Sequence, residues 1–397
     1  MCILWTSKPM WKANYFKIWS VNFMVHFAFD LVVPLLPLYL SETFGATRQM
    51  IGVCLAGYAV MAILIRPMSG FIVDSFPRKA VLMACALVFA AVFGGYIFAG
   101  SLVVFAIFRT LHGLPFGALT VSASTVMIDV LPSDRRAAGI GYYGLSNNLA
   151  KAIGPAVAVW LLHAVGGRYQ VLFWLSLLFA LGGFALCCSM KMPRRDFVPP
   201  SRVLSTDRFF LMKGWREALS MVPLAFAYGI ISTYVAIYGK EELGITRGTG
   251  LFFTLFAVGL IISRLTGTPA LRRNLVARNA ALGIIVSAFG YLLFALLHNP
   301  VGYYGAAFII GLGNGHMFPA YQTMFINLAE HNQRGTANSS VLTAWDLGIG
   351  LGMLFGGLLS GHFGYATAFW TAFFLYVAGA LYFILGVRPH FERCKLR

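Results

Sequence analysis

The stretch GFIVDSFPRK, from Gly70 to Lys79, decides the fold, because it sets Asp74, Arg78 and Lys79 within six positions between two long apolar runs. Of the 397 residues, 59% are hydrophobic and only 11% are charged, and the mean hydropathy is +0.77. A typical soluble domain carries about 25% charged residues. We therefore predict an integral membrane protein in which this stretch is a loop between two spanning helices.

The apolar runs set the predicted helix count. A spanning helix needs about 20 mostly apolar residues. The chain divides into runs at 16–39, 49–70, 80–98, 102–127, 138–162, 170–190, 216–239, 249–269, 279–297, 303–328, 336–361 and 364–387. The fold class that we predict is an all-α integral membrane protein with twelve transmembrane helices.

The net charge of +17 is explained by how the chain is oriented in the membrane. If the N-terminus is cytoplasmic, 22 of the 30 Lys and Arg residues lie on the cytoplasmic side, four lie on the far side, and four lie within helices. This asymmetry follows the positive-inside rule. A nucleic-acid partner is not needed to explain the charge, and both termini are expected in the cytoplasm.

The N-terminus and the cysteines add no processing or metal signal. MCILWTSKPMWKANYFK has no small-residue cleavage site after a short apolar stretch, so no removable signal peptide is expected. All six cysteines fall within predicted helices or on the cytoplasmic side. Their spacing predicts neither a disulfide framework nor a metal site.

The basic, proline-bearing segment Lys191–Glu217 divides the chain into two halves. We predict an N-terminal six-helix bundle over 1–190, a cytoplasmic central loop over 191–215 and a C-terminal six-helix bundle over 216–397. The halves are related at an offset of about 199 residues, because SETFGATR (41–48) aligns with KEELGITR (240–247). Two similar bundles repeated in the same direction are typical of transporters that rock about a midplane site.

Three motifs give the chain a resemblance to a known family. GFIVDSFPRK resembles the loop between helices two and three of the major facilitator superfamily. RTLHGLPFGA is similar to the helix-four motif of that family, with Arg109 and Gly113 in place, and LAKAIGPAVAV is similar to the helix-five motif of its proton antiporters, at Gly154 and Pro155. The resemblance implies two pseudo-symmetric six-helix bundles and transport by alternating access, as in the twelve-helix drug and metabolite:proton antiporters.

The chain departs from the family pattern at several motif positions. Pro77 stands where the loop motif usually has Gly, and His112 stands where the helix-four motif has Gln. Ala158 and Val159 replace the Gly-Gly that usually closes the antiporter motif. The direction of transport is therefore left open between export and import.

The loop motif is interpreted as a cytoplasmic latch. Helix two ends near Gly70, so that Asp74 can accept hydrogen bonds from a helix N-terminus, where the helix dipole favours an anion. Arg78 and Lys79 lie at the cytoplasmic edge, and Asp129 at the end of helix four is the expected partner of Arg78. Ordinary positive-inside anchoring also explains the two basic residues, but not Asp74.

Two acids lie near the middle of predicted helices, Asp30 and Asp346. An ionised Asp at a helix centre costs about 2.5 to 3.5 kcal/mol on the insertion scale. A carboxyl that is protonated when dehydrated and ionised when wet is a natural proton carrier, so both are candidates for proton coupling. Arg109 is the expected partner of Asp30. The alternative for either acid is a structural ion pair with Arg or Lys.

Other deep polar residues are candidates for a substrate cavity. Lys151 can contact an anionic group, snorkel to the surface or pair with a carboxylate. Trp345 lies away from the interfacial belts where Trp normally collects, which makes it a candidate for a stacking contact with a ring-bearing or amphiphilic substrate. The alternative is a lipid-facing side chain or packing in the core. Arg66 and Arg264 are interpreted as anchors near the cytoplasmic membrane edge. The full set of cavity candidates is His26, Asn147, Asn148, Lys151, Asn314, His316, Tyr321, Gln322 and Trp345.

The favoured function is proton-coupled export of small organic molecules, such as drugs, sugars or siderophore-like metabolites. No Gly-x-Ser-x-Gly stretch, Walker loop or His-Glu-x-x-His motif appears, so an enzyme is not predicted, and neither a cofactor nor a metal is expected. The alternatives are a proton-coupled importer and a non-transporting membrane receptor. The expected partners are the substrate, protons and the lipid bilayer. We expect a monomer in the bacterial cytoplasmic membrane.

Overall fold

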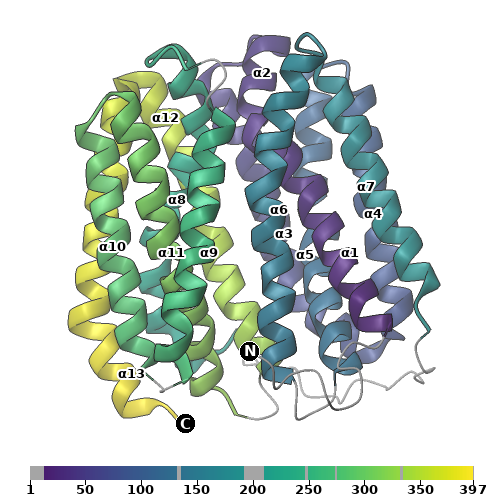
Figure 1. Ribbon diagram of the computed structural model, residues 1–397, viewed down its shortest axis with the longest axis vertical. Helices are drawn as coiled ribbons and strands as arrows, with labels where there is room; N and C mark the ends of the chain where they lie inside the picture. The colour runs from purple at the N-terminus through teal and green to yellow at the C-terminus, as the bar shows by residue number, and fades with distance from the viewer. Residues whose placement is uncertain are drawn as a thin grey trace.

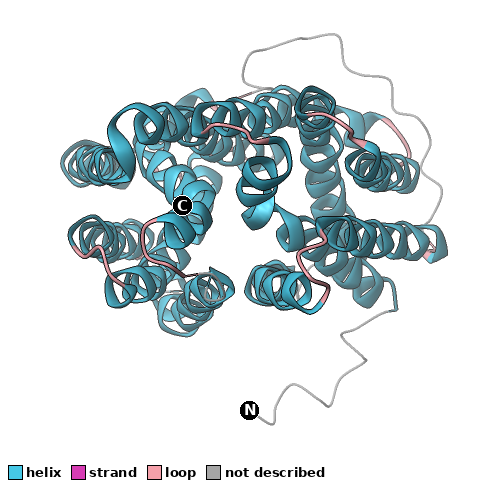
Figure 2. Cartoon of the chain, turned by 90° about the horizontal axis from the view of Figure 1, so that it is seen from above, coloured by secondary structure: helices cyan, strands magenta, loops and turns pink. Residues whose placement is uncertain are grey.

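The computed structural model describes residues 13–131, 136–191, 210–245, 249–272, 275–330 and 334–396, and over these ranges the protein is built from helices without strands (Figures 1 and 2). Helix α1 begins and α13 ends at the lower end of the view in Figure 1, and α2 lies at the upper end. We use "lower end" and "upper end" in this sense throughout.

The first half of the chain forms helices that run alternately up and down the molecule. Their bounds are α1 (Ala13–Val32), α2 (Leu36–Phe44), α3 (Arg48–Ser75), α4 (Arg78–Phe98), α5 (Leu102–Val130), α6 (Arg136–Ala164) and α7 (Tyr169–Ser189). A short 3-10 turn, Val33–Leu35, joins α1 to α2. Pro34 and Pro37 cannot donate backbone hydrogen bonds, so the regular α-helix is interrupted after Val32, two residues beyond Asp30.

The second half repeats this pattern. Its helices are α8 (Trp215–Glu241), α9 (Thr249–Arg272), α10 (Val276–Leu296), α11 (Pro300–Leu328), α12 (Arg334–Tyr382) and α13 (Arg388–Cys394), with a 3-10 turn at Met212–Gly214 and a π-helical stretch at Phe383–Val387. Helix α12 consists of two arms that meet at Gly364, whose φ of 83° favours glycine. The sequence had placed the boundary between its last two predicted helices at the same position.

Helix lengths agree with a protein that crosses the membrane many times. In the described residues, eight helical stretches are long and apolar enough to cross, and one of them, Thr336–Cys394, contains both arms of α12. The predicted all-α membrane fold is confirmed, while the count of twelve crossings stays a prediction.

The internal repeat is visible in the packing of aromatic side chains. The alignment placed Tyr39 over Tyr238. Tyr39 packs edge-on against Phe173 with ring centroids 5.1 Å apart, and Tyr238 packs edge-on against Phe369 at 4.9 Å. Equivalent positions thus make equivalent contacts near the upper end of each half.

The two halves lie side by side, with α1 to α7 on the right and α8 to α13 on the left of Figure 1. They meet closely through small residues. A Cβ atom at Gly52 of α3 would lie 2.7 Å from the Met353 carbonyl oxygen of α12, and one at Gly250 of α9 would lie 3.2 Å from the Ala156 Cα of α6. The domain boundaries at 190 and 216 remain our proposal, because 192–209 lie outside the described residues.

Candidate functional site

Asp30 lies three residues before the 3-10 turn that interrupts the first helix, and its side chain is half-buried. Its Oδ2 atom is shielded from solvent and has no hydrogen-bond partner among the described residues. Lys151 of α6 interacts with the Asp30 carboxylate electrostatically but lies beyond ion-pair distance of it in this part of the chain. The central acid of α1 is thus next to a base without being bonded to it.

The helix-five motif explains why α6 comes so close to Asp30. A Cβ at Gly154 would lie 3.1 Å from the Asp30 carbonyl carbon and 3.3 Å from its Cβ. The next residue, Pro155, carries a carbonyl oxygen that would lie 3.4 Å from a Cβ at Gly250 of α9. Gly154 and Pro155 therefore occupy a crossing where α6 packs against its own half and against the opposite half.

His26 lies one turn before Asp30 on α1 and is buried. Its Nδ1 donates a hydrogen bond to the Asn22 carbonyl oxygen at 2.9 Å, and its ring packs edge-on against Phe116. Lys151 and Arg66 both act on His26 electrostatically. Asp30 and Lys151 therefore form a charged centre on α1 and α6, with the buried His26 ring beside it.

Asp346 forms a buried ion pair with Arg66, whose Nε lies 2.5 Å from the Asp346 Oδ2. Arg66 is 3% exposed and Asp346 is 8% exposed. The interpretation of Arg66 as an anchor at the membrane edge was wrong, because α3 continues to Ser75, which places Arg66 about 14 Å inside the end of the helix. The pair joins α3 in the first half to α12 in the second half.

Arg109 does not pair with Asp30, which corrects the expected partnership. Its guanidinium lies over the ring of Tyr58, 4.4 Å from the centroid, and near that of Phe29 at 5.3 Å. Phe29 and Asp30 are neighbours on α1, so their side chains point about 100° apart. Phe29 faces Arg109 of α5, and Asp30 faces α6. Within the described residues, the Arg109 Nε and Nη1 atoms have no hydrogen-bond partner.

An aromatic wall belongs to the second half. Trp345 of α12 stacks on Tyr228 of α8 with centroids 5.5 Å apart and an interplanar angle of 28°, and it contacts Phe318 of α11 edge-on at 5.2 Å. Tyr228 in turn stacks on Phe256 of α9. Helix α8 also packs against the 3-10 turn Val33–Leu35, three residues after Asp30, which places this wall beside the charged centre of the first half.

The remaining amide candidates on α6 lie on the same stretch of helix as Lys151. Asn147 is one turn before Lys151 and is half-buried, and Asn148 is buried. The Asn147 Oδ1 and the Asn148 Nδ2 have no hydrogen-bond partner in the described part of the chain. These amides are therefore available to a ligand or to water.

The candidates on α11 have structural partners instead. They are Asn314, His316, Tyr321 and Gln322. His316 bonds to Asn279 of α10 and to Thr266 of α9, both at 3.0 Å. Tyr321 is fully buried and shares a 2.7 Å hydrogen bond with Ser220 of α8. Interhelical hydrogen bonds thus account for His316 and Tyr321, whereas the Asn314 Nδ2 has no hydrogen-bond partner among the described residues. The structure does not bring these side chains to the Asp30 centre.

The predicted cytoplasmic cluster lies at the lower end. Arg78 and Asp129 form the expected ion pair between α4 and α5. The Lys79 Nζ donates a hydrogen bond to the Cys188 carbonyl oxygen at 2.9 Å. The surroundings of Gly70 and the side chains of Asp74 and Arg264 lie outside the described residues.

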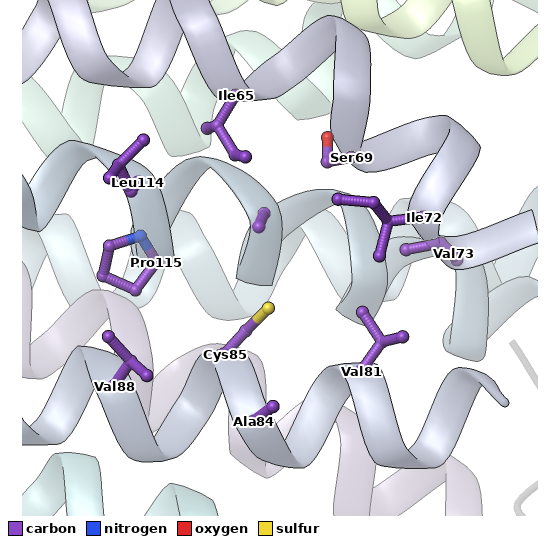
Figure 3. Close-up of a pocket in the computed structure, with 11 residues that line it drawn as sticks. Ile65, Ser69, Ile72, Val73, Val81, Ala84, Cys85, Val88, Leu114 and Pro115 are labelled. Atoms are coloured by element: carbon purple, nitrogen blue, oxygen red, sulfur yellow. The ribbon is translucent and has the colours of Figure 1, made fainter. Parts of the chain in front are cut away.

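A separate apolar pocket of about 250 Å³ lies between α3, α4 and α5 (Figure 3). Ile65, Val88, Leu114 and Pro115 line it, and Cys85 adds a thiol. Among the described residues, no charged side chain lines this pocket. It therefore offers none of the polar groups that distinguish the Asp30 centre.

Two ion pairs at the upper end were not found from the sequence. Lys240 of α8 reaches Glu42 of α2 at 2.5 Å, and Arg48 of α3 reaches Glu241 of α8 at 2.6 Å. Both pairs join the first half to the second. The repeat had aligned Glu42 with Glu241, but only the structure shows that each acid bonds to a base of the opposite half.

Each of these acids is also held by a tyrosine of its own half. The Tyr169 hydroxyl donates to Glu42 at 2.7 Å, and the Tyr365 hydroxyl donates to Glu241 at 2.9 Å. Within the described part of the chain, every ion pair between the halves other than Arg66–Asp346 lies at this end. The upper end is thus bridged in this conformation.

We expect the pair of Glu42 and Lys240 to bias the conformational equilibrium of the protein. Exposed ion pairs contribute about 0 to 1 kcal/mol. Glu42→Lys should therefore raise the population of the conformation with an open upper end by up to about fivefold. Combining it with Lys240→Glu should restore the original distribution. Spin labels at positions 100 and 298, which follow α4 and α10 at the upper end, are introduced in a cysteine-free background. The distance between them measures how often the upper end is open. Unchanged distance distributions in the single variant would show that the pair has no such role.

The all-helical, multi-pass chain with a repeated half and a charged centre defines a membrane transport protein. The chain belongs to the major facilitator superfamily, whose model matches residues 18–351 and 282–395. The predicted family is confirmed, and with it the prediction of a transporter that is not an enzyme.

Curated relatives resemble the chain over most of its length. The multidrug resistance protein MdtG of Rahnella sp. (strain Y9602) is 27% identical, with 96% of this chain and 95% of the relative covered. The staphylopine export protein of Staphylococcus aureus (strain Mu50 / ATCC 700699) is 24% identical over 78% of this chain and 80% of the relative. The quinolone resistance protein NorA of Staphylococcus aureus (strain MRSA252) is 22% identical over 87% and 88%.

Solved structures show the same fold at low sequence identity. A mutant peptide transporter POT in complex with sulfate has a TM-score of 0.79 at 14% identity, covering 98% of both chains. A bacterial homologue of the lysosomal transporter Spinster, inward-facing and occupied, has a TM-score of 0.76 at 14% identity, covering 98% of this chain and 99% of the other.

Proposed function

We propose that the protein exports small organic molecules across a bacterial cytoplasmic membrane in exchange for protons. The observation that carries the proposal is the Asp30 carboxylate, which lies at the centre of the first half without a bonded partner in the described residues. An intramembrane acid of this kind marks a proton or substrate path. Export is supported by the relatives, since MdtG, NorA and the staphylopine protein are named for resistance or export.

Alternating access supplies the transport cycle. The ion pairs of Glu42 and Glu241 close the upper end, which we assign to the outer side because the lower end carries the basic residues expected in the cytoplasm. A substrate then enters from the cytoplasm and binds near Asp30. Rocking of the two halves breaks the upper pairs and exposes the site to the outside. A proton that binds Asp30 there neutralises it for the return.

Asp346 has a different part in this proposal. Its ion pair with Arg66 joins the two halves, so the contact between α3 and α12 depends on the charge of both partners. Movement of the halves must either carry this pair along or break it. Asp346 therefore transmits the state of the centre to the bundle interface.

The test combines transport with proton counting. A thermal-shift screen of the purified protein against drugs and metabolites identifies a ligand, because binding stabilises the folded state. In inverted vesicles, an inside-acid pH gradient should drive uptake of that ligand, and the uptake should collapse with a protonophore. Uptake that ignores the gradient would overturn proton coupling, and uptake favoured by the opposite gradient would indicate an importer.

We also expect the cytoplasmic latch to set the turnover rate. Asp74→Asn removes the negative charge of the loop motif, so the cytoplasmic side should close less often and transport should slow more than binding weakens. Rates in proteoliposomes and binding in detergent, measured beside the exposed control Glu392→Gln, separate these effects. Equal rates for wild type and Asp74→Asn would argue against the latch.

A further inference from the structure

The centre holds two opposite charges that the protein does not bond to each other. Asp30 and Lys151 interact electrostatically, yet in the described residues neither forms a hydrogen bond or an ion pair. Arg66 and Asp346, by contrast, form an ion pair in which the Arg66 Nε lies 2.5 Å from the Asp346 Oδ2. A buried ion pair offsets desolvation only when its geometry is good. The buried Asp30 Oδ2 thus lacks a bonded partner, and the half-buried Lys151 forms no ion pair with it in the described residues.

Lys151 lies on a stripe of α6 that faces this centre. Asn147, Lys151 and Gly154 follow at i, i+4 and i+7, which places them on one helix face. Gly154 ends the stripe in contact with the Asp30 backbone. The Asn147 Oδ1 at the other end of the stripe is buried without a partner in the part of the chain that the structure describes. The stripe therefore presents a cation and an amide acceptor beside the acid.

Aromatic rings complete the surroundings from the second half. Tyr228 lies on α8, which packs against the 3-10 turn that follows Asp30, and it stacks on Trp345. Both rings are only partly covered by the protein. Trp345 is also held edge-on by Phe318. A ring fixed on two sides is a rigid stacking surface.

The geometry points to an aromatic zwitterion as the substrate class of this site, an inference that rests on the proposed function. The positively charged amine of the substrate would bind Asp30, its anionic group would bind Lys151 with Asn147 beside it, and its ring would stack on Trp345. A ligand with a single charge leaves one of the two protein charges without a partner, which is costly above all at the shielded Asp30 Oδ2. A zwitterion satisfies both charges at once.

The same assignment explains how a proton could be exchanged for the substrate. The ammonium group of the substrate binds the ionised carboxylate of Asp30, whereas a proton on that carboxylate removes the negative charge. Proton and ammonium therefore compete for one acceptor. His26 and the pair of Arg66 and Asp346 also face this centre, but His26 already donates to Asn22 and the pair is satisfied internally.

The test uses two series of probes that share a ring system and differ only in charge. One series is ciprofloxacin, its methyl ester, which carries only the ammonium, and its N-acetyl derivative, which carries only the carboxylate. The other is tryptophan, tryptophan methyl ester and N-acetyltryptophan. Binding to the purified full-length protein is measured by calorimetry in detergent at pH 7. In at least one series, we expect the zwitterion to bind about tenfold more tightly than either singly charged partner.

Three variants assign the charges to residues. Lys151→Gln should abolish the preference for the zwitterion over its ester, and Asp30→Asn should abolish its preference over the N-acetyl partner. Trp345→Ala should weaken the binding of all members of a series alike. Trp160 is exposed on the helix surface, so the control Trp160→Ala should leave the binding of every member unchanged. Circular dichroism and gel filtration exclude misfolding.

Several outcomes would overturn the inference. A zwitterion that binds no better than its ester and N-acetyl partners in both series, including the case in which none binds, contradicts the substrate class. Preferences that survive Lys151→Gln and Asp30→Asn contradict the site. In either case, uptake of a screened ligand driven by a pH gradient would still support the proposed function, so the two failures are distinguishable.

Discussion

Asp30→Asn is expected to abolish substrate uptake driven by a pH gradient in inverted vesicles, reducing it to the level of empty vesicles. The amide keeps the size and polarity of the side chain but cannot gain or lose a proton. Exchange of labelled for unlabelled substrate at saturating concentration should persist, because it requires only that the two halves rock. This separation of driven uptake from exchange is the signature of lost coupling.

Proton release gives the more direct readout. Wild-type protein in weakly buffered detergent should release protons on substrate addition, as a pH dye would show, and Asp30→Asn should release none. Arg109→Ala should still release them, since Arg109 contacts the rings of Tyr58 and Phe29 and forms no ion pair with Asp30 in the described residues. If Asp30→Asn releases as many protons as the wild type, Asp346 becomes the leading candidate.

The sequence carried the fold because hydropathy and charge reflect the bilayer directly. Long apolar runs predicted the helices, and the offset of about 199 residues predicted that Tyr39 and Tyr238 occupy equivalent places, which their ring contacts confirm. Arg78 and Asp129 were also paired correctly, because both lie at ends of helices on the same side of the membrane.

The partners of deep charges could not be predicted in the same way. Arg66 and Asp346 are 280 positions apart, and their contact depends on the register between α3 and α12. That register is set by close approaches such as Gly52 to the Met353 carbonyl oxygen, which leave no pattern in hydropathy. The end of α3 at Ser75 was equally decisive, because a helix predicted to end near Gly70 placed Arg66 too close to the membrane edge.

The ion pairs at the upper end could be predicted only in part from the internal repeat. The repeat aligned Glu42 with Glu241 and so indicated equivalent environments. It could not show that Lys240 and Arg48 cross to the opposite half, because pairing between halves depends on the conformation of the transporter. An internal repeat predicts the contacts within each half better than the contacts between halves.

The ion pair of Arg66 and Asp346 should give the largest effect on stability. Asp346→Ala leaves the Arg66 guanidinium, which is 3% exposed, without its carboxylate partner. Removing one member of a buried pair costs about 3 to 5 kcal/mol, because the remaining charge stays desolvated. Unfolding by SDS in mixed micelles should show this loss. Glu330→Ala, which removes the partner of Lys213 in a pair whose side chains are more than half exposed, should change stability by about 0 to 1 kcal/mol.

The double variant Arg66→Met with Asp346→Leu separates stability from function. Apolar replacements of similar volume remove both charges together, so most of the stability lost in Asp346→Ala should return. Transport should not return with it, because the contact between α3 and α12 would no longer depend on charge. A double variant that is stable and still couples uptake to the pH gradient would show that the pair serves only to hold the halves together. An unstable double variant would instead show that packing at this crossing, rather than the charges, determines how the halves meet.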